Sequence, residues 1–170
     1  MREIHVSEIT KTIRKLCIDA NYYLTEDMKA RLREARSKEN FAIAQNILDV
    51  LLENADIAKN EARPMCQDTG MAVVFLEIGQ EVHIVGGSLE EAIHEGVRQG
   101  YEDGFLRKSV VNDPIERINT KDNTPAIIYY DILPGDSFKI TVAPKGFGSE
   151  NMSQLKMLKP SDGIVGVKDF

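Results

Sequence analysis

The stretch RPMCQDTGMAVVFLEI, residues 63–78, divides the chain into two parts of different character. The residues before it contain neither proline nor glycine, and their apolar positions recur at helical spacing. The second half of the stretch, from Met71 to Ile78, is an apolar run of strand length interrupted only by Glu77. Beyond it, glycines and β-branched residues become frequent. Helices followed by a sheet with a packed helix predict an α+β fold.

The N-terminal segment, residues 1–62, is predicted to be helical. A first helix with Ser7 as its cap has one apolar face, formed by Ile9, Ile13, Leu16, Cys17 and Ala20. Thr25 is expected to cap a second helix, because acidic residues fill the turn after it. A third helix, residues 40–56, has apolar side chains on more than one face, so we expect it to be the central helix of the fold.

Residues 63–160 are predicted to form a mostly antiparallel sheet with one or more packed helices. The Gly79-Gln80 turn predicts that the strand at 71–78 forms a hairpin with a strand beginning at Val82. Ser88 and Glu91 have the spacing of a capping box, which predicts a helix from there to about Gly104. Two further strands are expected at 126–132 and 138–143, joined as a hairpin across the turn Pro134-Gly135-Asp136.

The charge and cysteine content exclude several classes of protein. The 170 residues include 21 Lys and Arg against 27 Asp and Glu, a net charge of −6. Without a basic tract, binding to nucleic acid or to an anionic membrane surface is not expected. Two cysteines rule out a disulfide scaffold and a self-contained four-cysteine metal site. The N-terminus lacks the apolar core of a signal peptide, so a cytoplasmic location is expected.

The segment Cys66-Gln67-Asp68-Thr69-Gly70 places a thiol, an amide, a carboxylate and a hydroxyl in one loop. A neighbouring carboxylate raises the pKa of a thiol, and no histidine is close in sequence, so metal ligation by Cys66 is favoured over nucleophilic catalysis. The alternative is a buried cysteine in a capped loop. Cys17 lies on the apolar face of the first helix and is expected in the core.

Two other segments carry groups that can bind anions. Residues 145–151, KGFGSEN, combine Lys145 with two glycines whose backbone N–H groups can approach a carboxylate or phosphate. A plain glycine turn is the alternative. Arg107, just beyond the helix that starts at Ser88, can hold a carboxylate through two parallel N–H bonds. The alternative for Arg107 is a solvated charge at a helix end.

Taken in order, the motifs Cys-Gln-Asp-Thr-Gly, Gly-Gly before a helix, Leu-Arg-x-Ser and Lys-Gly-x-Gly-Ser-x-Asn resemble those of a known family. They are similar to the alpha subunit, or N-terminal half, of the iron-sulfur-dependent class I fumarases, a family that includes the L-tartrate dehydratases. The similarity spans about residues 10–170.

The resemblance implies a hydro-lyase built around a [4Fe-4S] cluster held by three cysteines, with one open iron acting as a Lewis acid on a dicarboxylate. It implies that Cys66 is one cluster ligand, that Asp68 is an acid/base catalyst, and that Thr69 also takes part in catalysis. It further implies a set of substrate-binding residues: Gln67, Arg107, Lys145, Gly146, Gly148, Ser149 and Asn151. Such a site interconverts fumarate and L-malate by reversible hydration; tartrate, mesaconate and a non-catalytic binding role are the alternatives.

The family's other two cluster cysteines are not found in residues 1–170. We therefore expect this chain to be the N-terminal part of an alpha subunit, with residues 161–170 beginning a further element that is cut short; a frayed tail is the alternative. It should be inactive without the rest of that subunit and a beta subunit or C-terminal half, and an oligomer is expected. The three motif-bearing segments should converge on one cleft, bordered by exposed apolar surface.

Overall fold

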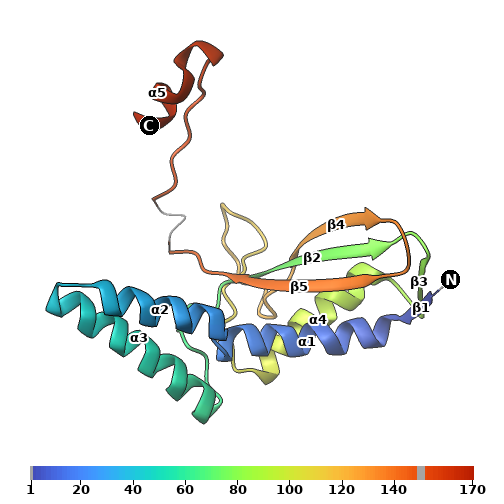
Figure 1. Cartoon of the computed structure of the whole chain (residues 1–170). Helices are drawn as coiled ribbons and strands as arrows, with labels where there is room; N and C mark the ends of the chain where they lie inside the picture. The colour runs from blue at the N-terminus through green and yellow to red at the C-terminus, as the bar shows by residue number, and fades with distance from the viewer. Residues whose placement is uncertain (1, 149–151) are drawn as a thin grey trace.

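A computed structural model describes residues 2–148 and 152–170. It confirms the α+β class: two helices lie side by side against one face of a three-stranded sheet, and a pair of helices extends from one end of this body (Figure 1). The elements are β1 (Arg2–His5), α1 (Val6–Tyr22), α2 (Glu26–Lys38), α3 (Ala42–Glu61), β2 (Met71–Gly79), β3 (Val82–Val85), α4 (Leu89–Asp103), β4 (Ile127–Leu133), β5 (Phe138–Lys145), a 3-10 turn (Pro160–Asp162) and α5 (Gly163–Lys168).

The strands are where they were predicted, but both predicted hairpins are wrong. In the three-stranded sheet the order is β4-β2-β5, so β2 lies between the two strands that were expected to pair with each other. β2 runs parallel to β4 and antiparallel to β5. β3 does not pair with β2; it forms a separate two-stranded parallel sheet with β1, a strand that the sequence reasoning did not predict. The three-stranded sheet is therefore mixed and the two-stranded sheet is parallel, so the pairing is not mostly antiparallel.

Alternation along β2 explains why this strand occupies the centre. Ala72, Val74 and Leu76 are buried against the helices, whereas Phe75 between them is exposed on the opposite face. Around this apolar row pack the buried residues of the two helices and the neighbouring loops: Ile9, Ile13, Cys17, Tyr22, Ile93, Val97, Tyr101, Leu106 and Ala126. The row of small and medium side chains lets α1 and α4 lie close to the sheet, and the expected core position of Cys17 is confirmed.

Two glycines on α4 allow α1 to approach it closely. A Cβ atom on Gly96 would lie 2.8 Å from the Cβ of Ile13, and one on Gly100 would lie 2.8 Å from the Cβ of Cys17. Real side chains do not tolerate such distances, so these positions require glycine as long as the helices stay at this spacing.

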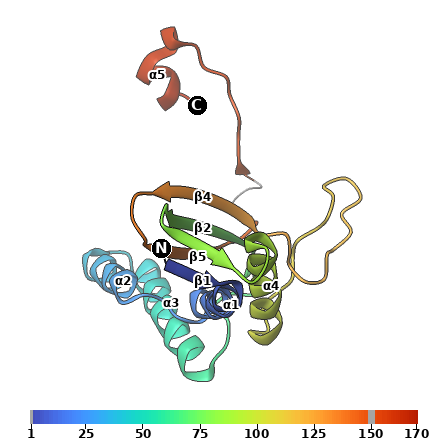
Figure 2. The ribbon, with the colours of Figure 1, turned by 90° about the vertical axis from the view of Figure 1, so that its right-hand side faces the viewer.

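α3 is not the central helix that its apolar residues predicted. Only Ala55 and Ala58 of α3 are buried, and its main neighbour is α2, with which it forms the extension from the body (Figure 2). Large apolar side chains of this region remain exposed: Phe41, Ile43, Ile47, Val50, Leu51 and Ile57. The central helices are instead α1 and α4, because their apolar faces meet the sheet and each other.

The helix starts are correct in position but differ in their caps. His5, not Ser7, is the N-cap of α1, and its Nδ1 accepts a hydrogen bond from the Ser7 N–H. Thr25 is the N-cap of α2 without a side-chain capping bond. At α4, the Ser88 hydroxyl accepts a hydrogen bond from the Glu91 N–H at 3.3 Å, as expected for a capping residue.

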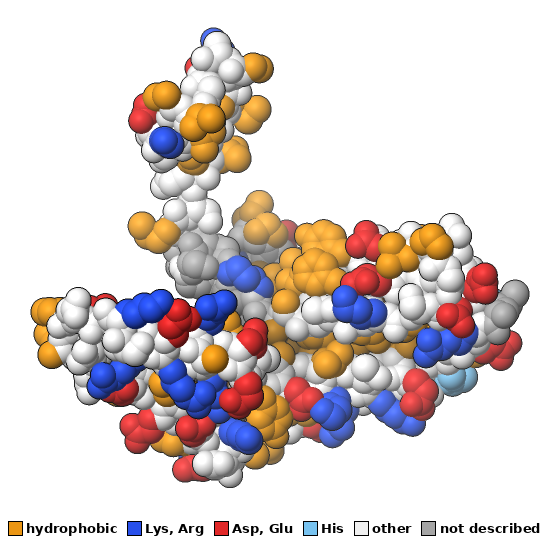
Figure 3. Space-filling view, in the orientation of Figure 1, with side chains coloured by type: hydrophobic (Ala, Val, Ile, Leu, Met, Phe, Trp, Pro, Cys, Tyr) orange, Lys and Arg blue, Asp and Glu red, His pale blue; other side chains and the backbone are white. Residues whose placement is uncertain are grey.

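The face of the β4-β2-β5 sheet that points away from α1 and α4 carries apolar side chains. Phe75 and Tyr129 stack on it with ring centroids 5.2 Å apart, and Figure 3 shows apolar side chains gathered above the sheet. Beyond the described part of the glycine loop, residues 152–170 lie apart from the body in both ribbon views and end in α5. Among the described helices, none has the length and apolar character needed to cross a membrane.

Candidate functional site

The loop that carries the Cys-Gln-Asp-Thr-Gly motif is anchored at both ends. At its start, the Met65 N–H donates to the Asn21 carbonyl at 2.9 Å and the Asn54 side-chain amide donates to the Met65 carbonyl at 2.9 Å. At its end, Gly70 has φ +61, and a Cβ there would lie 2.0 Å from the Lys145 carbonyl oxygen. Only glycine fits this position, where the loop meets the end of β5.

The carboxylate of Asp68 joins this loop to the glycine loop after β5. One oxygen, Oδ1, accepts a hydrogen bond from the Gly70 N–H at 3.1 Å. The other, Oδ2, accepts from the Phe147 N–H at 3.0 Å. A Cβ on Gly146 would lie 3.1 Å from the same oxygen, so a larger residue would crowd the carboxylate. Backbone N–H donors of this kind hold a carboxylate in a fixed direction.

Arg107 is positioned by the backbone around it. Leu106 is buried and its N–H donates to the Tyr101 carbonyl at 3.0 Å. The Thr69 hydroxyl donates to the Arg107 carbonyl at 3.1 Å, which ties this loop directly to the cysteine loop. The Arg107 side chain itself is exposed. Thr69 is buried and its hydroxyl is engaged in this contact; the catalytic role predicted for Thr69 stays a prediction.

Two adjoining cavities lie at the meeting point of the three segments. The first, about 520 Å³, is lined by Asp68, Arg107 and Phe147, together with Met71, Ser109, Val110, Val111, Pro114 and Arg117. The second, about 350 Å³, is lined by Cys66, Gln67 and Arg107 among others. Arg107 lines both, so the cysteine, the carboxylate and the guanidinium are on one side of the molecule and not on opposite faces.

The glycine loop contributes through its backbone as far as the structure describes it. Lys145 is at the end of β5, and its ammonium donates to the Gly146 carbonyl at 2.8 Å. Gly148 is exposed, and a Cβ there would meet no atom within 4 Å. Ser149 and Asn151, also predicted to bind substrate, lie outside the described residues.

Of the two cysteines in the chain, Cys66 is exposed and Cys17 is buried. The exposure of Cys66 contradicts the alternative of a buried cysteine in a capped loop. Its Sγ accepts a hydrogen bond from the Asp68 N–H at 3.4 Å, a contact of the kind that stabilises the negative charge of a thiolate or cluster sulfur. Within residues 2–148 and 152–170, no group of three or more metal-binding side chains comes together. Among the described residues, Cys66 is therefore a single exposed thiol donor at this loop.

The sequence reasoning missed two buried residues that support these loops. The Tyr101 hydroxyl donates to the Thr69 carbonyl at 2.8 Å, and burial raises the pKa of Tyr101 so that it remains a donor. Asn123 is fully buried with φ +63. Its amide nitrogen donates to the Gly70 carbonyl at 3.0 Å, and its oxygen accepts from the N–H groups of Ser109 and Val110. The sequence signal available for Asn123 was its position as a polar residue two positions before Pro125. Its hydrogen-bond partners are distant in sequence, so a local pattern does not reveal them.

Three loops surround the two adjoining cavities: one carries a thiol and a carboxylate, one carries an arginine, and one contains glycines. Together they define a candidate anion-binding site on an α+β domain. The family model described as fumarate hydratase (Fumerase) matches residues 10–170. The chain belongs to this family.

Relatives with curated descriptions cover nearly the whole chain. It is 43% identical over 169 residues to a "Putative L(+)-tartrate dehydratase subunit alpha" of Methanocaldococcus jannaschii, covering 96% of this chain and 59% of that relative. It is 26% identical to an "L(+)-tartrate dehydratase subunit alpha" of Escherichia coli strain UTI89, covering 97% of this chain and 55% of that relative. The chain thus spans little more than half the length of these relatives.

Proposed function

We propose that this chain is the cluster-binding and substrate-binding part of an alpha subunit in a hydro-lyase that reversibly hydrates a dicarboxylate. The observation that carries the proposal is the Asp68 carboxylate, held by two backbone N–H groups at the edge of a cavity that Arg107 also lines. Family membership and the relatives' names support the reaction class. The names also support a beta subunit as partner, because these relatives are described as alpha subunits.

In this proposal each residue has a separate task. Arg107 binds one substrate carboxylate through paired, charge-assisted hydrogen bonds. Asp68, oriented by Gly70 and Phe147, moves a proton to or from the substrate. Gly148 and its loop offer backbone N–H groups to the carboxylate on which negative charge develops. Cys66 would hold a [4Fe-4S] cluster together with cysteines from outside this chain, and the bound cluster supplies Lewis-acid chemistry at the departing hydroxyl.

Two substrates are candidates for the same chemistry. Fumarate and L-malate are the substrates that the resemblance first suggested, and the family description supports them. L-tartrate is the second candidate, and the names of the relatives favour it. Both have two carboxylates, so Arg107 alone does not discriminate between them.

The experiment that tests the proposal is an anaerobic assay of the assembled enzyme, with the complete alpha subunit and its beta subunit, on fumarate, L-tartrate and mesaconate. Replacing Asp68→Asn should lower kcat by about 10²- to 10⁴-fold with a smaller change in KM, because proton transfer is lost while the asparagine oxygen still accepts one of the two backbone hydrogen bonds. Glu90→Gln, on the exposed face of α4, is the control. No activity on any of the three dicarboxylates, or full activity of the Asp68 variant, would contradict the proposal.

A further inference from the structure

The cavity beside Asp68 contains a second guanidinium that no motif pointed to. Arg117 lines the same cavity of about 520 Å³ as Asp68 and Arg107. The ion pairs that the structure shows for arginine side chains are made by other arginines: Arg14, Arg31, Arg36, Arg63 and Arg98. Within the described ranges, therefore, the charges of Arg107 and Arg117 are not neutralised by an acidic partner.

The backbone fixes Arg117 on the wall of this cavity. Residues 110–120 form an excursion closed by hydrogen bonds between its two arms, from the Asn112 N–H to the Ile118 carbonyl and from the Thr120 N–H to the Val110 carbonyl. The Arg117 N–H donates to the Asp113 carbonyl at 2.9 Å, and Arg117 has φ +56. Figure 2 shows this excursion projecting beside α4, opposite the α2–α3 pair.

The remaining lining of the cavity suits a small dianion. Its other walls are largely apolar, formed by Met71, Val110, Val111, Pro114 and Phe147. Ser109 also lines it, although its hydroxyl oxygen is buried and has no hydrogen-bond partner among the described residues. Two guanidiniums and one carboxylate give the cavity a formal charge of +1. An apolar wall strengthens the attraction between such a charge and a bound anion, because water is partly excluded.

We propose that Arg117 binds the second carboxylate of the substrate, so that Arg107 and Arg117 together select dicarboxylates over monocarboxylates. This inference rests on the proposed function for the identity of the ligand, but it concerns binding and makes no demand on the chemical step. Arg117 is thus a specificity-determining residue, whereas Asp68 is a catalytic one.

The test compares dicarboxylate and monocarboxylate ligands of the assembled enzyme. Succinate and propionate differ by one carboxylate and serve as unreactive competitive probes. In Arg117→Ala, the dissociation constant of succinate should rise by about 10- to 100-fold, the size expected for a lost charge-assisted pair, while that of propionate should change less than about twofold. Arg117→Lys should recover part of the affinity, because the charge remains but the paired geometry is lost.

Lys121→Ala is the matched control, since Lys121 directly follows the 110–120 excursion, is exposed, and also has a positive φ, +69. It should leave both dissociation constants unchanged. Equal loss of succinate and propionate binding in Arg117→Ala, or no loss of either, would overturn the inference. Calorimetry reports binding without turnover, so a wild-type enzyme that binds succinate through Arg117 but hydrates none of the substrates would overturn the proposed function and leave this inference standing.

Discussion

A single buried side chain, Asn123, holds two loops of the site in register. Its three hydrogen bonds reach Gly70, which follows the cysteine loop, and Ser109 and Val110, which follow Arg107. All three partners are backbone groups, so these hydrogen bonds fix the path of the backbone and not only the conformation of a side chain. Asn also tolerates its positive φ better than most residues, because its short polar side chain suits the left-handed region.

Replacing Asn123→Ala should therefore cost about 3 kcal/mol of unfolding free energy, because three backbone groups lose their partner in a buried place. Chemical denaturation of the variant measures this loss. Asn112→Ala, at an exposed position of the neighbouring excursion, is the control and should cost less than about 0.5 kcal/mol. Equal stability of the two variants would show that the Asn123 contacts are not important for holding the loops.

The two thiols should differ in reactivity by their surroundings alone. Cys66 is exposed in the loop, whereas Cys17 is buried in the core and its burial raises its pKa to about 12. A thiol reagent at pH 8 should modify one cysteine of the native chain quickly and the second only after unfolding. Cys66→Ser should abolish the fast reaction, and Cys17→Ser should leave it unchanged. Two fast equivalents in the native chain would contradict the structure.

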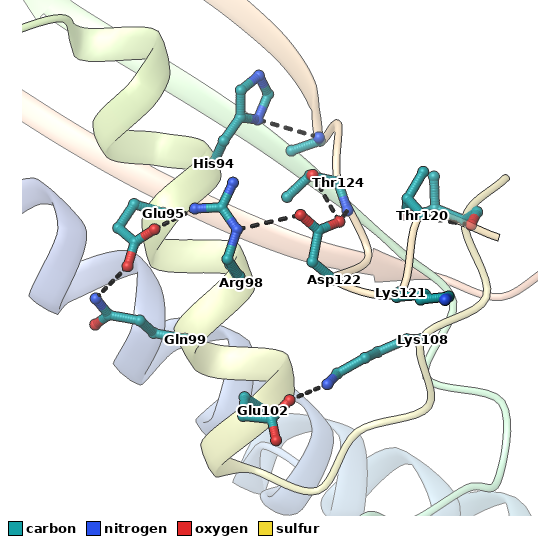
Figure 4. A network of polar contacts seen from close by, with 12 residues as sticks. His94, Glu95, Arg98, Gln99, Glu102, Lys108, Thr120, Lys121, Asp122 and Thr124 are labelled. Carbon is teal, nitrogen blue, oxygen red and sulfur yellow. Dashed lines mark hydrogen bonds and ion pairs between the residues drawn. The ribbon is translucent and has the colours of Figure 1, made fainter. Parts of the chain in front are cut away.

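At the scale of elements, α4 fastens the loop that precedes β4. Arg98 pairs with Asp122 at 3.1 Å and also contacts Glu95, and the Asp122 carboxylate accepts hydrogen bonds from the N–H and hydroxyl of Thr124 (Figure 4). On the same side, the His94 Nδ1 accepts from the Ala126 N–H at 3.3 Å. These contacts bring the end of the loop onto the helix, next to the position where Asn123 turns inward.

The ionised state of Asp122 should make this attachment sensitive to acid. Burial acts to raise the pKa of Asp122, but hydrogen bonds from Thr124 and Arg98 outweigh it and lower the pKa to about 2, from an ordinary value of 3.8. Because the folded pKa is the lower one, the stabilisation is present above about pH 4 and is lost as pH falls towards 2; it is on the order of 2 kcal/mol.

Asp122→Asn should remove this contribution at pH 7 and flatten the dependence of unfolding free energy on pH between 4 and 2. Denaturation curves measured across that range test it. Asp136→Asn, at the exposed turn between β4 and β5, is the control and should keep the wild-type slope. An unchanged slope in the Asp122 variant would mean that the Arg98 and Thr124 contacts do not stabilise the folded state.

At the scale of the whole molecule, the sheet has one covered and one open face. α1 and α4 cover the first, while Phe75 and Tyr129 are 42% and 56% exposed on the second. This exposed apolar surface lies on β2 and β4, whereas Thr141 and Lys139 of the last strand, β5, share the face, so it is not centred on the last strand as expected. Phe105, 87% exposed, lines the second cavity. Apolar surface gathered in this way is typical of a face that contacts other protein.

The double substitution Phe75→Thr and Tyr129→Thr should lower the binding of a fluorescent apolar dye to the native chain, because it removes the stacked rings from the open face. The cost in unfolding free energy should be only about 1 kcal/mol, the size of an exposed aromatic pair. Dye fluorescence and denaturation of the same samples test both statements. Unchanged dye binding, or a loss of several kcal/mol, would show that these side chains are covered in solution.

Local sequence was sufficient for much of the fold and of the site. Caps and apolar spacing located α1, α2 and α4 to within a few residues, and alternating β-branched runs located β2, β4 and β5. The motif-bearing segments were identified because glycines, a thiol and charged groups are unusual in such short loops. These segments were predicted to converge on one cleft; in the structure Asp68, Arg107 and Phe147 line one cavity, and Cys66 lines a second one that Arg107 also lines.

Only the tertiary structure decided the strand partners, the central helices and the loop supports. The turn before β5 predicted a hairpin, yet β2 inserts between β4 and β5, because pairing depends on which apolar faces can be buried together across the whole chain. α3 has the apolar residues of a core helix but lies outside, since α1 and α4 occupy the face of the sheet. Asn123 supports the site through a hydrogen bond to a group distant in sequence, and Arg117 shares a cavity with Asp68 because the tertiary fold brings their loops together.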